Sequence, residues 1–170
     1  GGGGEMLNLV RQGAADIASV TPPIFVDQLP NSMIGALPGL VQDVKIASQA
    51  WHDLVMPHRG GELFESDFKN AGVRPIDSWN LGAAEISTVD TKIEKKSDLE
   101  GLKIRAAGGH AASTIEVLGG SPVSMATPQI YQALQRGSID GLLAGPMTWR
   151  DFNTYEVANY TTRGAPLVNG

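Results

Sequence analysis

The sequence predicts an α/β protein, because strand-like and helix-like patterns alternate through its second half. Apolar strands are expected at residues 103–106, 122–125 and 138–143, with a helical pattern in each interval. A strand–helix–strand–helix–strand order at this spacing predicts parallel strands joined by right-handed crossovers. The composition agrees with a folded protein, since 42% of the 170 residues are hydrophobic and this suffices for one or two small globular units.

The first half contains shorter elements separated by turns rich in glycine and proline. A helix is expected over residues 5–12, ended by Gly13, and an apolar strand follows over residues 15–20. Residues 33–37 predict a further strand, and residues 73–84 have an extended pattern.

Two further helices are expected in the first half, after Asp43 and over residues 62–70, where Gly72 stops the second. The helix after Asp43 has apolar residues at steps of three and four, which places them on one core-facing stripe. This stripe consists of Val44, Ala47, Trp51, Leu54 and Val55.

The two helices of the second half connect its three strands. The first is expected over residues 110–118 and is stopped by glycines. The second begins at Thr127, which is expected to cap it, has Pro128 at its first position and ends at Arg136.

Charge and composition exclude several classes of function. The net charge of −5 and the lack of a Lys/Arg cluster argue against nucleic-acid binding, which depends on neutralised phosphates. No apolar run is long enough to embed the chain in a membrane. The absence of cysteine excludes disulfides, zinc–thiolate sites and thiol nucleophiles. His52, His58 and His110 match no zinc spacing, so neither a metal nor another cofactor is expected.

Arg105 is the principal candidate for ligand binding. It lies in a predicted strand directly before Gly108, Gly109 and a helix, and open α/β sheets bind ligands beyond the carboxyl ends of their strands. An arginine there can hold a carboxylate through two parallel hydrogen bonds, with backbone amides of the glycines nearby. The alternative is a surface arginine paired with Glu100 or Glu116.

Three segments of the second half resemble a known family. SDLEGLKIRAAGG (97–109), LGGSPVSM (118–125) and IYQALQRGSIDG (130–141) are similar to the substrate-binding subunits of tripartite ATP-independent periplasmic (TRAP) transporters. The upstream VRQGAADIASV segment (10–20) is similar in order and spacing, so the resemblance covers nearly the whole chain.

The resemblance implies a two-lobed architecture with parallel and mixed sheets, of which this chain is a middle portion, incomplete at both ends. Residues 1–82 would belong to the first lobe, residues 83–164 would form the second, and residues 165–170 would begin the strand that returns to the first lobe. It also implies a periplasmic protein that captures a small organic carboxylate between the lobes, without a cofactor, and delivers it to membrane permease subunits.

The resemblance places the carboxylate-binding arginine of the family on Arg105. A polar position of the family falls near Ala144 or Gly145, so a backbone contact would have to replace it. A second family arginine falls on Glu85, which would disfavour a plain dicarboxylate unless an internal cation pairs with it. The remaining residues expected to border the ligand are Thr21, Ala84, Ala107 and Trp149.

Two alternatives to transport remain open at this point. One is an α/β enzyme acting on a carboxylate, with Asp140, Glu85 or His110 as acid or base, although no nucleophile motif or cofactor loop is present. The other is a binding subunit that presents its ligand to a sensor.

Overall fold

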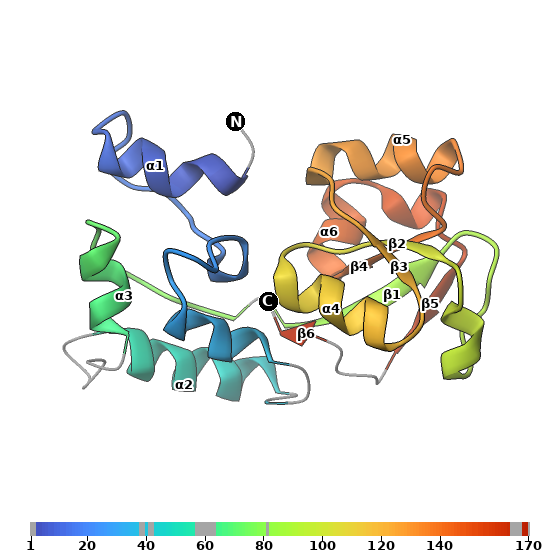
Figure 1. The fold of residues 1–170 in the computed structure, drawn as a ribbon, viewed down its shortest axis with the longest axis horizontal. Coiled ribbons are helices and arrows are strands. Elements are labelled where there is room, and N and C mark those ends of the chain that lie inside the picture. The colour runs from blue at the N-terminus through green and yellow to red at the C-terminus, as the bar shows by residue number, and fades with distance from the viewer. Residues whose placement is uncertain are drawn as a thin grey trace. The chain divides into compact units, whose positions relative to one another are not determined.

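The computed structural model describes residues 3–37, 40, 43–56, 64–80, 82–163 and 168–169. The chain divides into two compact units, Gly1–Gly82 with Asn169–Gly170 and Ala83–Val168. Each unit buries apolar side chains of its own, and the elements of each are labelled in Figure 1. Whether these units are the two lobes expected from the sequence stays a prediction.

The first unit is built from helices and extended segments. Its helices are α1 (Met6–Arg11), α2 (Val44–Val55) and α3 (Glu65–Asn70), with 3-10 helices at Gly3–Glu5, Pro22–Ile24 and Asn31–Ala36. One cluster of buried residues consists of Leu7, Phe25, Leu29 and Ala71, and a second consists of Val55, Met56 and Phe64.

Helix α2 confirms the helix predicted after Asp43, but only part of its stripe is buried. Ala47 and Val55 are buried, and Trp51 packs against Phe64 with ring centroids 5.1 Å apart. Val44 and Leu54 remain 47% and 40% exposed. The helical period is therefore correct, whereas the apolar face covered within this chain is narrower than expected.

The side chain of Asp43 caps α2, and we predict that its loss weakens the helix. Its carboxylate accepts hydrogen bonds from the backbone N–H groups of Lys45 and Ile46, at 2.8 and 3.0 Å. Asp43→Ala should lower the free energy of unfolding by about 1 kcal/mol, the usual cost of losing such a cap. Chemical denaturation measures this effect, and Asp43→Asn, which keeps an acceptor oxygen, should retain most of the stability.

Two strands predicted in the first unit are wrong. Residues 15–20 form no strand, and Asn31–Ala36 is a 3-10 helix where a strand was expected at 33–37. The buried carboxylate of Asp67 explains the second difference, because it accepts hydrogen bonds from Ser32 N at 2.9 Å and Asn31 Nδ2 at 2.8 Å. This long-range contact holds residues 31 and 32 against α3, whose predicted first residues, 62 and 63, lie outside the described residues.

Residues 83–169 contain a mixed sheet of six strands, all of which belong to the second unit except Asn169 of the last strand. They are β1 (Ala83–Thr88), β2 (Lys103–Arg105), β3 (Ser121–Val123), β4 (Gly141–Ala144), β5 (Tyr160–Thr162) and β6 (Val168–Asn169). The order is β3-β2-β4-β1-β5, and β6 also pairs with β1. Strand β2 runs parallel to β3 and β4, which confirms the predicted parallel pairing, whereas β1 is antiparallel to β4 and β5. Of the predicted return strand, residues 165–167 and 170 lie outside the described residues.

Helices lie on both faces of this sheet. Helix α4 (Gly109–Val117) connects β2 to β3, and α5 (Ile130–Gln135) connects β3 to β4. The connection from β2 to β3 and the connection from β3 to β4 lead in opposite directions across the sheet. If both crossovers are right-handed, their helices must lie on opposite faces of the sheet. Figure 1 shows α4 and α5 on opposite faces. Helix α6 (Pro146–Asp151) lies on the α5 side, and 3-10 helices occur at Lys96–Leu99, Thr127–Gln129 and Thr154–Glu156.

Thr127 does not cap a helix, contrary to the prediction. The residue at the cap position is Ala126, and Thr127 begins the 3-10 turn that leads into α5. Its hydroxyl oxygen instead accepts a hydrogen bond from Arg105.

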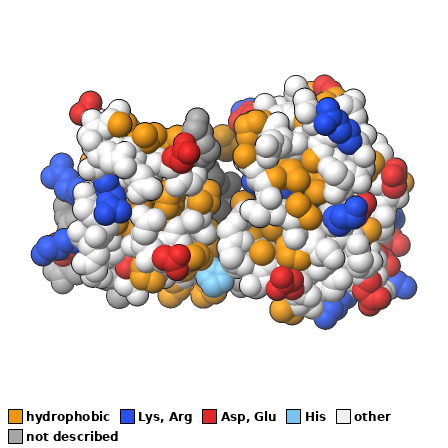
Figure 2. Space-filling model, turned by 45° about the horizontal axis from the view of Figure 1, so that its top comes forward, with side chains coloured by type: hydrophobic (Ala, Val, Ile, Leu, Met, Phe, Trp, Pro, Cys, Tyr) orange, Lys and Arg blue, Asp and Glu red, His pale blue; other side chains and the backbone are white. Residues whose placement is uncertain are grey.

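No described helix is both long and apolar enough to cross a lipid bilayer. The face in Figure 2 shows Lys and Arg side chains scattered among acidic and hydrophobic ones, without a continuous basic stripe.

Candidate functional site

Arg105 lies at the carboxyl end of the parallel strand β2, where ligands bind in open α/β sheets. It is only 7% exposed. Its Nε and Nη2 atoms donate to the carbonyl oxygen of Met125 at 3.3 and 3.2 Å, and Nη2 also donates to Thr127 Oγ1 at 3.3 Å. These bonds hold the guanidinium against the segment that leads from β3 into α5.

The positive charge of Arg105 has no counter-ion among the described residues. None of their carboxylates forms an ion pair with it, and its Nη1 group donates no hydrogen bond to them. Burial lowers the pKa of the Arg105 guanidinium because losing water disfavours the charged form, yet a guanidinium stays protonated at neutral pH. An unpaired buried cation is costly, so this arrangement favours an anion from outside the chain.

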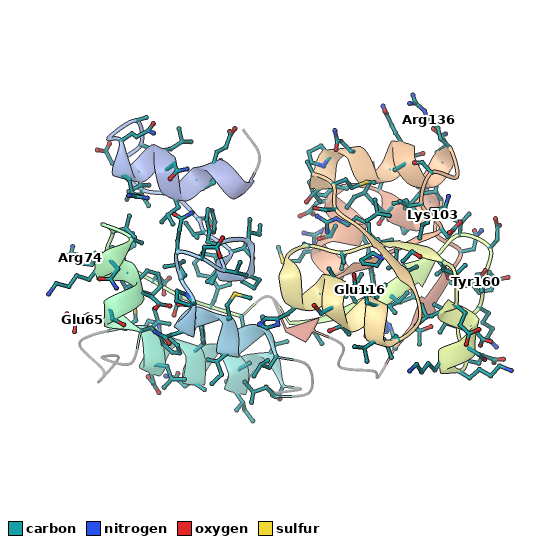
Figure 3. All side chains as sticks on the ribbon, viewed as in Figure 1. Glu65, Arg74, Lys103, Glu116, Arg136 and Tyr160 are labelled. Carbon is teal, nitrogen blue, oxygen red and sulfur yellow. The ribbon has the colours of Figure 1, made fainter. Side chains whose placement is uncertain are left out.

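The surface ion pairs weighed for Arg105 are not formed. Neither Glu100 nor Glu116 pairs with it in the described structure. Glu116 projects from α4, on the opposite side of the sheet from α5 (Figure 3). Arg105 instead turns towards the start of α5, as its bonds to Met125 and Thr127 show.

The strand register places Glu85 on the same sheet face as Arg105. Arg105 is aligned with Leu142, and Glu85 with Ala144, two residues further along β4. Side chains two residues apart on a strand share a face. Arg105 and Glu85 therefore lie on one face, with β4 between them.

Glu85 has a cationic partner, which changes its predicted effect on the ligand. Its Oε2 atom lies 3.6 Å from Arg163 Nε, and the Glu85 side chain is 19% exposed. The same oxygen accepts no hydrogen bond within the described residues. Arg163 is 75% exposed and is not the internal cation considered above, so it offsets the charge of Glu85 only in part and weakens the argument against a dicarboxylate ligand.

Trp149 lies on α6 and packs, half-buried, against the core on this face. Its neighbours are the buried cluster of Ile130, Leu134, Ile139, Leu142 and Ala144. The indole Nε1 is buried, and no described residue accepts a hydrogen bond from it. A donor of this kind usually has a partner, so Trp149 remains a candidate for contacting a ligand.

A cavity of about 310 Å³ lies where β2 meets the amino end of α4. Arg105 is not among its lining residues, since the guanidinium turns towards Met125 and Thr127. The predicted cooperation between Arg105 and the amides of Gly108 and Gly109 thus stays a prediction. The lining residues are Ala106, Gly108, Gly109, Ala112, Pro122, Val123 and Ser124.

The other predicted site residues are half-buried and lie at the ends of elements. Ala84 is in β1, Ala107 follows β2, and Gly145 precedes α6. Thr21 belongs to the first unit, where it precedes the 3-10 helix Pro22–Ile24. Their contacts with a ligand stay predictions.

The residues considered for catalysis are not brought together. The Asp140 carboxylate accepts a 2.7 Å hydrogen bond from the backbone N–H of Lys103, at the amino end of β4. Glu85 lies beside the opposite end of that strand, and His110 is on α4. The described residues also contain no group of three or more His, Asp or Glu suited to a metal ion.

Three groups at this site were not predicted from the sequence. The Met125 carbonyl has no sequence signal, because any residue supplies a backbone oxygen. Thr127 was predicted to cap a helix and was not predicted to contact Arg105. Arg163 follows β5, whose antiparallel pairing with β1 brings it near Glu85, and that pairing was not predicted.

Comparisons with known sequences place the chain in a family. A sequence model of the bacterial extracellular solute-binding proteins of family 7 (DctP) matches residues 1–166. A solute-binding protein of Chromohalobacter salexigens is 26% identical over 165 residues, which cover 96% of this chain and 48% of the relative. The sialic acid-binding periplasmic protein SiaP of Vibrio cholerae is 29% identical, over 63% of this chain and 36% of that protein. The chain spans about half the length of the curated relatives it matches most extensively.

Solved structures have the same fold. A TRAP periplasmic solute-binding protein from Chromohalobacter salexigens with bound D-glucuronate matches with a TM-score of 0.86 and 25% identity, covering 99% of this chain and 55% of that one. A TRAP solute-binding protein of an unidentified marine microbe, in complex with 3-hydroxybenzoate, matches with a TM-score of 0.86 and 24% identity, covering 99% and 51%. The predicted α/β fold class is confirmed.

These matches confirm the resemblance found in the sequence and favour a binding protein over an enzyme. The chain belongs to the bacterial extracellular solute-binding proteins of family 7, a family of periplasmic solute-binding proteins.

Proposed function

We propose that this protein binds a small organic carboxylate in the periplasm and delivers it to the membrane permease subunits of a TRAP-type transporter. The main support is the buried charge of Arg105, which has no counter-ion among the described residues. A carboxylate would supply that missing charge and accept from the Nη1 group. The transporter partner rests on family membership alone.

The remaining predicted residues would surround the ligand beyond its carboxylate. We propose that the Trp149 indole N–H and the backbone near Ala107 and Gly145 contact it, with Ala84, Glu85 and Thr21 at its border. The unused Trp149 donor supports a ligand with an acceptor oxygen besides the carboxylate. A sugar acid or a hydroxy acid meets this requirement.

The relatives support a carboxylate as the common element of the ligand. One is described with D-glucuronate, another as binding sialic acid, and a third as binding C4-dicarboxylates. We propose that Arg105 fixes the carboxylate and that the other side chains select the remainder of the molecule.

We further propose that residues 1–82 and 83–164 act as two lobes that close on the ligand. Closure needs only a ligand that binds the closed state more tightly than the open one. Neither covalent chemistry nor a cofactor enters this mechanism.

A thermal-shift screen with matched acids and neutral analogues tests the proposed ligand class. D-glucuronate would be paired with glucose, and mandelate with mandelamide. At a free ligand concentration 100 times Kd, the bound acid should stabilise the protein by about 2.7 kcal/mol, which raises Tm by about 5–10 °C for a chain of this length. The neutral partners should leave Tm unchanged, because they lack the charge that pairs with Arg105.

Two results of this screen would contradict the proposal. Equal stabilisation by an acid and its neutral analogue would refute the proposed role of a carboxylate. A panel of sugar acids, hydroxy acids, aromatic acids and dicarboxylates in which no acid raises Tm would refute the proposed function.

A further inference from the structure

Glu85 has a buried carboxylate oxygen that no described residue satisfies. Its Oε2 atom accepts no hydrogen bond from the described part of the chain, and the side chain is only 19% exposed. Arg163 Nε lies 3.6 Å from this atom, which is beyond hydrogen-bonding distance. Because an ion pair to an exposed arginine contributes little, the Oε2 atom still requires a hydrogen-bond donor.

The next polar side chain on this face of β1 has a partner within the sheet. Ser87 is two residues from Glu85, so the two side chains point to the same face. The Oγ atom of Ser87 is hydrogen-bonded to Thr161 Oγ1 at 3.0 Å. The sheet therefore satisfies Ser87 but leaves Glu85, near the amino end of β1, without a donor among the described residues.

Glu85 and Arg105 lie at the same edge of the sheet. Because β1 is antiparallel to β4, the amino end of β1 lies beside the carboxyl end of β4, and β4 is parallel to β2. Trp149 packs against Leu142 and Ala144 on this face, and its indole Nε1 also lacks a partner among the described residues. One face thus presents an unpaired cation, an unused acceptor and an unused donor.

The three groups require different chemistry from one ligand. A carboxylate pairs with Arg105, after which Trp149 still requires an acceptor and Glu85 a donor. A second carboxylate or a carbonyl group only accepts hydrogen bonds, and an ammonium group only donates them, whereas a hydroxyl group does both. Hydroxyl groups are therefore the substituents that satisfy both Trp149 and Glu85.

We propose that Glu85 selects hydroxylated acids, because its Oε2 atom accepts a hydrogen bond from a hydroxyl group of the ligand. This role rests on the proposed function, in which Arg105 holds the carboxylate. Rotation about the terminal torsion of the Glu85 side chain, which is broad, turns Oε2 towards the ligand. A plain dicarboxylate would leave this oxygen without a donor and place a second negative charge near it.

The strand spacing indicates where the hydroxyl group lies in the ligand. Strand β4 separates β1 from β2, and neighbouring strands are about 4.8 Å apart, so the backbones that carry Glu85 and Arg105 are about 10 Å apart. The guanidinium also turns towards Met125 and Thr127, which follow β3 on the far side of β2 from β1. The hydroxyl group should therefore lie several bonds from the carboxylate, as it does in a sugar acid.

Matched acids with and without a remote hydroxyl group test this role by isothermal titration calorimetry. D-glucuronate would be compared with tetrahydropyran-2-carboxylate, and 3-hydroxybenzoate with benzoate. The hydroxylated acid of at least one pair should bind at least about 10-fold more tightly, because a hydrogen bond to a charged acceptor changes Kd by about 10-fold to 100-fold. An ammonium analogue, 3-(aminomethyl)benzoate, should bind no more tightly than 3-hydroxybenzoate.

Variants separate the effect of Glu85 from that of Arg105. Glu85→Met removes the acceptor and should reduce the preference to about 3-fold or less, whereas Glu85→Gln keeps a neutral acceptor oxygen and should retain part of it. Arg105→Met should weaken both acids of a pair alike. Glu116→Met is the matched control and should leave the preference unchanged, since Glu116 projects from α4 on the other face of the sheet (Figure 3).

Three results would overturn the role of Glu85 and leave the proposed function intact. They are equal affinity for both acids in every pair that binds, an undiminished preference in folded Glu85→Met or Glu85→Gln, and tighter binding of 3-(aminomethyl)benzoate than of 3-hydroxybenzoate. If no acid binds at all, the proposed function fails and the role of Glu85 fails with it.

Discussion

Arg105→Met is expected to lower the affinity for the carboxylate ligand by about 100-fold or more. The substitution removes the buried cationic group at the carboxyl end of β2. Two charge-assisted hydrogen bonds to a carboxylate are worth about 3 kcal/mol or more, which corresponds to about 100-fold in Kd. Isothermal titration calorimetry with an acid identified by thermal shift measures the loss.

Stability distinguishes a ligand-binding role for Arg105 from a structural one. Because the buried guanidinium has no counter-ion, replacing it with an apolar side chain of similar length should leave the ligand-free protein equally or more stable. Arg136→Met is the matched control, since Arg136 is exposed after α5 and points away from the unit (Figure 3). Retained affinity in Arg105→Met, or an equal loss in Arg136→Met, would contradict the site assignment.

Gly141→Ala should destabilise the second unit by about 3 kcal/mol. A Cβ atom there would overlap the carbonyl oxygen of Ser87 and lie 2.8 Å from Thr88 Cγ2 and 3.0 Å from Ile104 Cδ1. The backbone of β1 would have to move, and overpacking of this kind costs about 1–3 kcal/mol or more. Thermal unfolding followed by circular dichroism should show Tm lower by about 6–12 °C.

The control for this prediction is Gly4→Ala. A Cβ atom at Gly4 would meet only Ile24 Cγ2, at 3.8 Å, which is an ordinary packing distance. Its Tm should stay within about 2 °C of the parent value, because surface substitutions rarely change stability by more than about 0.5 kcal/mol. An unchanged Tm for Gly141→Ala would show that β1 and β4 are not packed as described.

The second unit could be predicted from the sequence better than the first. The parallel strands of the second unit follow one another in the sequence and lie together in the sheet. Strands β2, β3 and β4 are each separated by one helix, so periodicity and turn residues are sufficient to identify them. The first unit depends on long-range contacts. Residues 15–20 need a pairing partner to become a strand, and residues 31–36 are held by the distant carboxylate of Asp67.

At the site, too, the features with a local sequence pattern were predicted and those that depend on long-range contacts were not. Arg105 was identified because the end of a strand followed by glycines is a local pattern. Its hydrogen-bond acceptors lie about twenty residues later in the chain, and the Arg163 partner of Glu85 lies across an antiparallel pairing. No local sequence pattern encodes these contacts. Which charged groups pair at the site could therefore be determined only from the structure.

A crystal structure of the protein with a bound acid, identified by thermal shift, tests the central claim most directly. Both carboxylate oxygens should lie about 2.7–2.9 Å from nitrogen atoms of Arg105, the distance of a charge-assisted hydrogen bond. At least one of those nitrogens should be Nη1. A bound acid whose carboxylate contacts other residues, while Arg105 keeps only its bonds to Met125 and Thr127, would contradict the account.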